Sequence, residues 1–393
     1  MLQHCSKNCY NVEVIQTNKT VLLVRNIWHD AYGGGEKYQI ELSKLLVKHG
    51  FNPVIVSSSK ALLAVAKSSG LKTQRGLWLT HQNWSGYRLL FFGFYVFWQI
   101  ILFFWYRYLI KKYRPIALHI QSRDDMIAGT LAGHNTKTRV IWTDHADFRE
   151  IWQNVDVKFK NPIGKIIRRV AKYTYKIATV SKSEYNFIAQ HAGKNLSKKM
   201  VMTPNGIVDK YDSKFNPEKR SYVKICFIGR IIASKGVFEL IEAFKLAKSQ
   251  IPNLRLDIIG DGPEAPLARW AAKNTEHISF TGFLNDPMKH LASCDVFVLP
   301  TYKEGLSTSL LEASMMQKAI ITTDIDNNRE IATDHQTGLL VPVKDTKKLC
   351  SAIVELAENP DLRIKLAKNA RLNYLKNFDF NKIVADLIIP LYL

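Results

Sequence analysis

Cysteine is scarce in this sequence, and its placement argues against a disulfide-bonded scaffold and against a structural zinc site. The chain of 393 residues contains five cysteines, which are Cys5, Cys9, Cys226, Cys294 and Cys350. Their number is odd, and no cluster of cysteine and histidine has the spacing of zinc ligands. The first twenty residues lack the apolar core of a secretory signal peptide. We therefore expect a cytoplasmic protein in a reducing compartment, without a structural metal.

Acidic residues are also in short supply. Only 34 Asp and Glu stand against 55 Lys and Arg, which gives a formal net charge of +21. This excess suggests an acidic partner, such as nucleic acid, an anionic membrane surface or a phosphorylated substrate. A basic protein without such a partner is the alternative. No helix-turn-helix, RNP or zinc pattern is present, so nothing except charge favours nucleic acid, and we expect none as a partner.

Short apolar runs alternate with amphipathic stretches, which is typical of parallel sheets covered by helices. The expected strands lie at 20–26, 52–58, 117–122, 140–145, 176–181, 223–230, 254–260, 277–282, 296–300 and 319–324, and the first helix at about 36–48. The segment 203–215 has a proline, an Asn-Gly pair and no apolar period, so it separates two halves. We predict two doubly wound α/β domains facing a cleft, at 1–206 and 207–375. A C-terminal helix at 376–393 is expected to pack back on the first domain.

One apolar stretch meets the usual length for a transmembrane helix. Residues 89–106, LLFFGFYVFWQIILFFWY, contain no charge. The stretch lies between strands expected in one sheet, so crossing a bilayer would place those strands on opposite sides. Two alternatives remain, namely a helix partly buried in the first domain and a helix lying in the membrane interface. We favour the second, because the stretch is apolar nearly all round.

Basic residues cluster close to this stretch and again further along the chain. Lys111, Lys112 and Arg114 follow it directly, and 157–183 holds eight basic residues and no acidic one. Apolar side chains alternate with the basic ones, as in an amphipathic helix. We predict that 89–114 and 157–183 contact an anionic membrane surface. A solvated face on a core helix is the alternative for the second segment.

Glycines and cations follow the first expected strand of each half. Gly33, Gly34 and Gly35 lie between a strand and a helix, where they would let a ligand approach the backbone. Their pattern, GGGEK, is not the dinucleotide fingerprint, and a plain tight turn is the alternative. In the second half, Arg230 follows Gly229 and Lys235 comes five residues later. Two cations at the carboxyl end of a parallel strand suit a diphosphate, although each alone is more often a surface charge.

Carboxylates and a histidine follow two further strands. Glu304 lies in the loop after the strand at 296–300, and Glu312 lies within the helix that starts near Ser307. The helix N-terminus would point N–H groups at the same place, so sugar hydroxyls and phosphates could bind together. His145 ends a strand of the first half and would face this region. A histidine of its type is otherwise structural or solvated.

The ordered set of motifs resembles the retaining glycosyltransferases of family 4. The matching segments are GGGEK, TDH, TPNGI, IGRIIASKG, IIGDGPE, TGF, EGLSTSLLEA and TGLLVP, spread over about residues 20–375. The resemblance implies the GT-B fold, a nucleotide-sugar donor and no cofactor or metal. It also implies retention by front-face attack without a protein nucleophile. We further predict an acceptor at the inner face of a membrane, lipid-linked or part of a glycolipid or polysaccharide.

The resemblance assigns roles residue by residue. Arg230 and Lys235 would bind the donor diphosphate, Glu304 the sugar hydroxyls and Glu312 the ribose. The backbone of Gly305, Leu306 and Ser307 would lie near the sugar and the phosphate, and Gly282 and Phe283 would lie beside the base. Gly33 to Gly35 would line the cleft. His145 would lie close to the reacting sugar. Ser307 replaces a proline or glycine of many members, and Gln317-Lys318-Ala319 replaces a glycine-proline turn, which leaves the choice of sugar open. A nucleotide-sugar epimerase on the same fold and a nucleic-acid-binding protein are the alternative functions.

Overall fold

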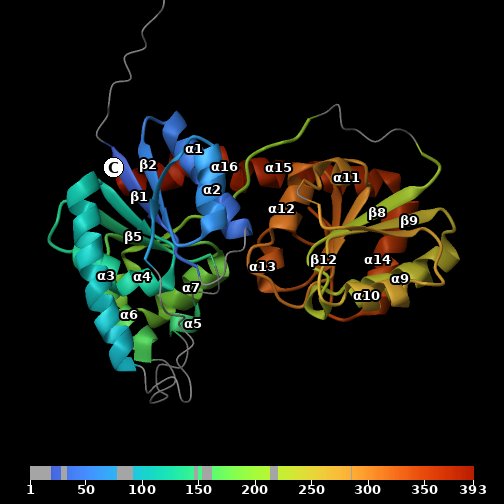
Figure 1. Cartoon of the computed structure of the whole chain (residues 1–393). Coiled ribbons are helices and arrows are strands. Elements are labelled where there is room, and N and C mark those ends of the chain that lie inside the picture. The colour runs from blue at the N-terminus through green and yellow to red at the C-terminus, as the bar shows by residue number, and fades with distance from the viewer. Residues whose placement is uncertain are drawn as a thin grey trace, which may run out of the picture.

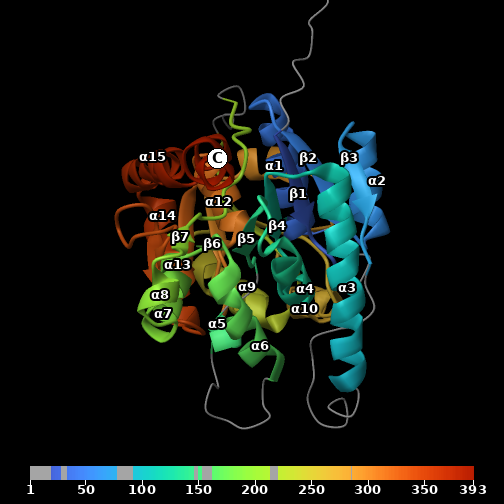
Figure 2. The ribbon, with the colours of Figure 1, turned by 90° about the vertical axis from the view of Figure 1, so that its left-hand side faces the viewer.

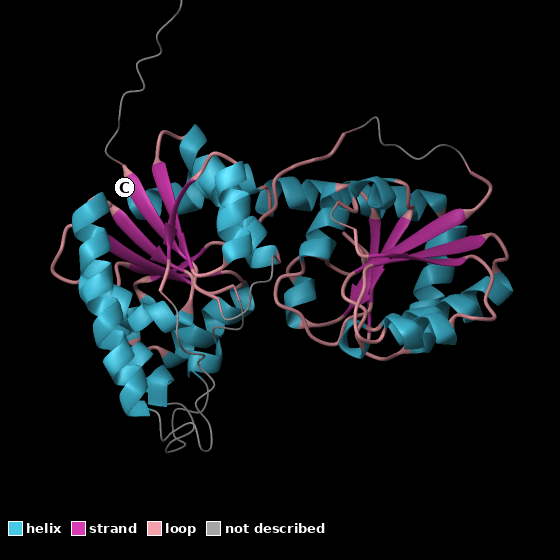
Figure 3. Ribbon diagram, viewed as in Figure 1, coloured by secondary structure: helices cyan, strands magenta, loops and turns pink. Residues whose placement is uncertain are grey.

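A computed structural model describes residues 19–27, 33–77, 92–145, 149–152, 162–212, 220–284 and 286–393. Its two halves each contain one parallel sheet with helices on both faces (Figures 1 and 3). This arrangement confirms the predicted pair of doubly wound domains. Cys5, Cys9 and parts of the two segments predicted to contact a membrane, at 89–91 and 157–161, lie outside the described residues.

The N-terminal sheet has seven strands in the order β3-β2-β1-β4-β5-β6-β7. Its strands are β1 (Thr20–Val24), β2 (Asn52–Ser57), β3 (Lys72–Arg75), β4 (Ala117–Ile120), β5 (Arg139–Thr143), β6 (Lys176–Thr179) and β7 (Met200–Met202). The helices are α1 (Gly34–Lys48), α2 (Lys60–Ser68), α3 (Phe92–Tyr113), α4 (Arg123–Gly133), α5 (Arg149–Trp152), α6 (Pro162–Val170), α7 (Lys182–His191) and α8 (Lys194–Ser197), with a 3-10 turn η2 (Ala171–Tyr173). β1 lies between β2 and β4, so the chain reverses its strand order there, where ligands bind in open α/β sheets.

The C-terminal sheet has six strands in the order β10-β9-β8-β11-β12-β13. The strands are β8 (Val223–Ile228), β9 (Leu254–Ile259), β10 (Ile278–Gly282), β11 (Val296–Leu299), β12 (Ala319–Thr323) and β13 (Leu339–Val341). The helices are the 3-10 turn η4 (Ala233–Lys235), α9 (Val237–Gln250), α10 (Ala265–Ala271), α11 (Met288–Ala292), α12 (Thr308–Met315), α13 (Asp326–Arg329), α14 (Thr346–Glu358) and α15 (Pro360–Asn377). β7 and β8 thus lie on either side of the expected division between residues 206 and 207.

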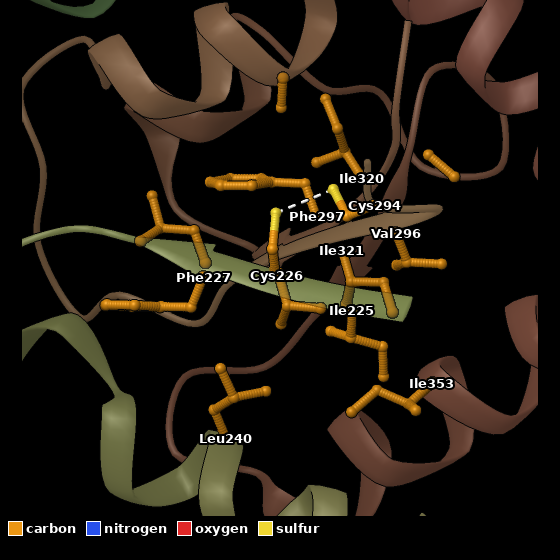
Figure 4. Packing of buried hydrophobic residues seen from close by; sticks show 14 of the residues in the cluster. Ile225, Cys226, Phe227, Leu240, Cys294, Val296, Phe297, Ile320, Ile321 and Ile353 are labelled. Carbon is orange, nitrogen blue, oxygen red and sulfur yellow. Dashed lines mark hydrogen bonds between the residues drawn. The ribbon is translucent and has the colours of Figure 1, made fainter. Parts of the chain in front are cut away.

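The core of the C-terminal domain is made by the apolar strands and the inner faces of α9, α12 and α14. Figure 4 shows its centre, where β8 and β11 lie against Leu240 and Ile353. The thiols of Cys226 and Cys294 lie side by side there, with their Sγ atoms 2.8 Å apart. Both side chains are fully buried, and burial raises the pKa of Cys226 well above its usual value. These cysteines are packing residues of the core.

The end of the chain returns to the N-terminal domain. After α15 come α16 (Phe380–Ile383), a π-helical turn η5 (Val384–Ile388) and α17 (Ile389–Tyr392). Phe380, Val384 and Tyr392 join the cluster formed by β1 and α1. The Tyr392 hydroxyl is also 2.7 Å from Nδ1 of the buried His119 in β4. The C-terminal segment is therefore part of the first domain's core.

Helix α3 carries the apolar stretch. Among the described residues, Gly93–Tyr113 is the one helix that is long and apolar enough to cross a membrane by length and composition. It packs along α4 on the side of the N-terminal domain away from the C-terminal domain (Figures 1 and 2). β3, which precedes it, and β4, which follows it, belong to the same sheet, and β4 is hydrogen-bonded to β1.

Candidate functional site

A cleft of about 400 Å³ lies between the two domains. The N-terminal domain lines it with the start of α1 and with His145. The segment between β7 and β8, which we call the linker, contributes Asn205. The C-terminal domain lines it with the start of α12, including Thr308 and Glu312. Polar groups from both halves therefore converge in one concave space, as in a site for a small polar ligand.

The glycine turn before α1 is held by two charged side chains. Glu36 accepts a hydrogen bond from the Gly33 backbone at 2.8 Å and another from Nε of Arg25 at 2.7 Å. A Cβ atom on Gly35 would lie 2.1 Å from Nη2 of Arg25. A larger residue at position 35 would therefore have to displace the Arg25 guanidinium that binds Glu36.

Two helix N-termini face each other across the cleft. α1 begins at Gly34 and α12 at Thr308, and a Cβ atom on Gly34 would lie 3.7 Å from the Thr308 hydroxyl. Ser307 caps α12 by accepting a hydrogen bond from the Leu310 backbone at 3.5 Å. Free N–H groups and the positive ends of both helix dipoles meet here, which favours an anion such as a phosphate.

Lys235 and Glu304 form an ion pair at the carboxyl ends of β8 and β11. The two loops that carry them are bonded together, since Tyr302 donates from its backbone to Ser234 at 2.8 Å. Gly236 follows Lys235 with φ 72°, and a Cβ atom there would lie 2.0 Å from the Pro300 carbonyl. Glycine is therefore required for the loops to come so close, and the structure brings these two predicted residues together.

Arg230 is exposed at the end of β8, and its backbone carbonyl accepts a hydrogen bond from the Ile232 backbone at 3.0 Å. Gly229, just before it, donates to the Ile259 carbonyl at 3.0 Å. The Gly260 turn packs against Gly229, where a Cβ atom would lie 1.9 Å from the Gly229 oxygen. The segment Gly260-Asp261-Gly262 thus supports the end of β8, which Arg230 follows.

Glu312 lies in the cleft on the inner side of α12. Burial raises the pKa of its carboxyl group to about 7, and the positive charges of Lys37 and Lys210 oppose this rise. The two lysines also line the cleft, one from α1 and one from the linker. Glu312 can therefore accept or donate a hydrogen bond near neutral pH, as a ribose hydroxyl requires.

His145 reaches the cleft from the end of β5. Its Nδ1 lies 2.9 Å from Oδ1 of Asn205, and its ring packs 4.3 Å from the ring of Tyr38. Burial and the neighbouring Arg25 charge lower the pKa of His145 to about 3, so the ring is neutral. It shares the cleft with Glu312 and Leu306.

The remaining predicted residues lie at the rim of the C-terminal domain. Gly282 ends β10 with φ 73°, and the next residue, Phe283, is 71% exposed. A flat aromatic ring in this position suits stacking against a base. Gly305 has open space where a Cβ would point. Leu306 lines the cleft directly.

The sequence interpretation missed four cleft-lining or supporting residues. Arg25, Lys37, Asn205 and Lys210 carry charge or polarity next to the predicted ones. Lys37 is part of the quoted GGGEK turn, and Asn205 is part of TPNGI, which marks the domain boundary and belongs to the family motifs without giving Asn205 a role. Across the described residues, no group of three or more His, Cys, Asp or Glu side chains is arranged to hold a metal ion.

The fold and cleft define a GT-B-type glycosyltransferase, and comparisons with known proteins identify the family. Residues 209–373 match the family model "Glycosyl transferases group 1", and residues 32–210 match "Glycosyltransferase Family 4". The matches meet at the linker and together span nearly the whole described chain. The chain belongs to the group 1, family 4 glycosyltransferases, which confirms the resemblance found in its motifs.

Curated relatives share part of their length with this chain. An uncharacterized glycosyltransferase of Methanocaldococcus jannaschii is 28% identical over 62% of this chain and 66% of its own. The N,N'-diacetylbacillosaminyl-diphospho-undecaprenol alpha-1,3-N-acetylgalactosaminyltransferase of Campylobacter jejuni is 34% identical over 43% of this chain and 44% of its own length. The phosphatidyl-myo-inositol mannosyltransferase of Mycobacterium leprae is 30% identical over 49% and 53%. The aligned regions thus span about half to two thirds of these relatives.

Solved structures share the fold over almost the full length. A glycosyltransferase of Rickettsia africae superposes with a TM-score of 0.73 and 19% identity, covering 95% of this chain and 97% of its own. The HepE protein of Anabaena, in complex with UDP, superposes with a TM-score of 0.72 and 14% identity, covering 95% and 99%. At this identity the likeness establishes the two-domain fold.

Proposed function

We propose that this protein is a retaining, metal-independent glycosyltransferase that moves a sugar from a nucleotide-sugar to a membrane-associated acceptor. The observation that carries the proposal is the Lys235–Glu304 pair beside the N-terminus of α12. An ammonium group and free helix N–H groups suit a diphosphate, and a carboxylate next to them suits sugar hydroxyls. A donor with both parts fits this order of groups.

The proposed chemical step is the one that the family resemblance implies. The bond between sugar C1 and the diphosphate oxygen breaks while the acceptor oxygen bonds to C1 on the same face. The acceptor's proton passes to the departing phosphate oxygen. Lys235 and Arg230 stabilise the negative charge that grows on the leaving diphosphate, which is the main contribution expected of the protein.

The acceptor assignment draws support from the relatives and from α3. Two of the relatives are named for acceptors built on undecaprenyl diphosphate or phosphatidylinositol. In α3 an apolar stripe is exposed on the outer face of the helix. The outer stripe is apolar and 37–65% exposed, and consists of Phe94, Phe97, Ile101, Phe104 and Tyr108. We call this the outer stripe of α3.

The inner face of α3 buries Leu102 and Leu109 together with two polar groups. Gln99 donates to the Asp124 carbonyl at 3.1 Å, and the Tyr106 hydroxyl donates to Asp125 at 2.6 Å. A surface helix in water usually presents polar residues on its outer face. The exposed apolar stripe therefore favours a lipid environment, with the helix lying in the membrane interface.

Basic side chains accompany α3. Lys111, Lys112 and Arg114 are exposed at its C-terminal end. Arg169 on α6 and Lys172 on η2 are exposed on the same domain. α6 buries Ile163 and Ile167, so part of 157–183 is a core helix with a charged outer face. We propose that these cations contact anionic headgroups and hold the enzyme at the inner face of a membrane.

The experiment measures release of nucleoside diphosphate by the purified protein. A panel of uridine and guanosine diphosphate sugars is supplied with membranes that contain lipid-linked acceptors, with and without EDTA. We expect release that depends on membranes, survives EDTA and falls about 100-fold in Lys235→Ala and Glu304→Ala. Lys245→Ala and Glu242→Ala, which break an exposed ion pair on α9, are the matched controls.

Two results would decide against the proposal. Full activity in both site variants would reject the site, and an inverted anomeric configuration in the product would reject retention. A changed sugar nucleotide formed from the donor alone would instead identify an epimerase.

A further inference from the structure

His145 has one satisfied ring nitrogen and one free one. Nδ1 is 2.9 Å from Oδ1 of Asn205, whereas Nε2 is buried and has no hydrogen-bond partner among the described residues. Both residues line the cleft between the domains. An unpartnered buried nitrogen next to an open cleft is available to a ligand, because leaving it unmatched is costly.

The protonation state of the ring follows from its surroundings. Burial and the positive charge of Arg25 keep the imidazole neutral, so that it carries a single N–H. The Asn205 atom beside Nδ1 is the amide oxygen, which only accepts hydrogen bonds, so this orientation of the amide pairs with a proton on Nδ1. The lone pair of Nε2 is then left for the cleft.

We propose that Asn205 is a positioning residue that fixes His145 in its Nδ1–H tautomer, so that Nε2 accepts a hydrogen bond from a hydroxyl group of the bound sugar. The tautomer assignment rests on the geometry of these two residues. The sugar hydroxyl as its ligand rests on the proposed function.

Asn205 is itself held by the chain on both sides. Thr203 donates from its backbone to the Thr179 carbonyl at 2.9 Å, which fixes the preceding segment to β6. Ile207 donates to the Phe378 carbonyl at 3.2 Å and accepts from the Phe380 backbone at 3.1 Å. Asn205 therefore lies between two backbone anchors, one on β6 and one on the segment that follows α15, which hold its backbone in place.

Gly206 tightens this arrangement. A Cβ atom there would lie 2.7 Å from the Phe378 carbonyl oxygen and 2.7 Å from the Ile383 side chain. The backbone at Gly206 thus lies against residues 378–383, which lead from α15 into α16, and Asn205 next to it reaches His145. The Asn-Gly pair of TPNGI thus has a structural reason beyond that of a turn.

The test determines the tautomer of His145 by NMR in protein labelled with ¹⁵N-histidine, without any ligand. The His145 signals are assigned by their loss in His145→Gln. At pH 7 we expect a protonated Nδ1 and an unprotonated Nε2 in the wild type. Asn205→Asp should keep this tautomer, because a carboxylate also accepts, and Asn205→Leu should lose it. Asn253→Leu, at an exposed asparagine of the other domain, is the matched control.

Activity supplies the second measurement. We expect Asn205→Leu to lower kcat about tenfold or more while KM for the donor changes little, and Asn205→Asp to restore most of kcat. An Nε2–H tautomer in the wild type, or an unchanged tautomer in Asn205→Leu, would overturn the positioning role. If the tautomer is as expected but no sugar is transferred, the proposed function fails while the Asn205–His145 assignment stands.

Discussion

The outer stripe of α3 offers the most direct test of where this enzyme works. The perturbation is Phe97→Ser together with Phe104→Ser, which removes the two most exposed phenylalanines among the side chains described in α3. Their side chains are 58% and 65% exposed and lie two turns apart on one face. The change should therefore leave the packing of α3 on α4 intact while removing apolar surface that faces outward.

The magnitude follows from the exposed area. A phenylalanine can bury about 150–250 Å², so roughly 100 Å² of each ring is free to enter a bilayer interface. At about 25 cal/mol per Å², each contributes up to about 2.5 kcal/mol. Even if the interface covers only half of this area, the double variant loses about 2.5 kcal/mol, or a factor of roughly 60 in partitioning.

The assay is flotation with vesicles that contain anionic lipid. We expect the wild type to float and the double variant to remain largely in the soluble fraction, with unchanged thermal stability. Ile364→Ser with Leu372→Ser removes two side chains of similar exposure, 63% and 54%, from α15 and should have no effect. Equal flotation of wild type and the α3 variant would refute the membrane assignment.

Three further changes test separate parts of the structure. Burial raises the pKa of Glu312 from 4.5 to about 7, so the stability present at low pH is lost as the pH rises through 7. Through this group the free energy of unfolding of the wild type should fall by roughly 3 kcal/mol between pH 4 and pH 8. Glu312→Gln should not show that fall in urea titrations. Tyr392→Phe should lower stability by about 1 kcal/mol, measured as a fall in Tm, because the buried His119 loses a hydrogen bond of 2.7 Å. Gln317→Gly should raise Tm slightly, since Gln317 has φ 54° and a non-glycine residue there costs about 1 kcal/mol; an unchanged or lower Tm would contradict the strain argument.

Buried apolar strands were the readily predicted part of the fold. β1, β2, β8 and β11 read as continuous apolar runs because both faces of a parallel sheet are covered. β3, with the sequence KTQR, was missed, since it lies at the sheet edge and is largely polar. β7 has only three residues and also lies at an edge. The apolar signal fails where a strand is short or open to solvent on one side.

The orientation of α3 could not be obtained from its sequence. Its residues are apolar nearly all round, so no hydrophobic period marks an inner face. The structure shows that Phe103 and Trp105 pack toward the core, whereas Phe97 and Phe104 face outward. A substitution of Phe103, Phe104 and Trp105 together, as the sequence alone would suggest, would disturb folding as well as membrane contact.

The site residues that motifs revealed are those whose own short segment carries a recognisable pattern. Glu304 and Glu312 lie in one segment, and Lys235 follows its strand by a short loop. Asn205 was missed because its role depends on His145, sixty residues away, and on a crossover that returns from the C-terminal domain. Such contacts arise from tertiary structure, so a local pattern cannot contain them.

The buried polar face of α3 joins the two surfaces on which the proposed function depends. The Tyr106 hydroxyl and the Asn26 amide both donate to Asp125, at 2.6 Å and 3.0 Å, in a site where that carboxyl is almost fully buried. Asn26 follows Arg25, whose guanidinium binds Glu36 at the glycine turn of the cleft. A helix held only by apolar contacts could slide along α4, whereas directional hydrogen bonds to a buried carboxylate fix its position. If the outer stripe lies in a membrane, these bonds set a constant distance between the lipid surface and the cleft, which an acceptor anchored in that membrane requires.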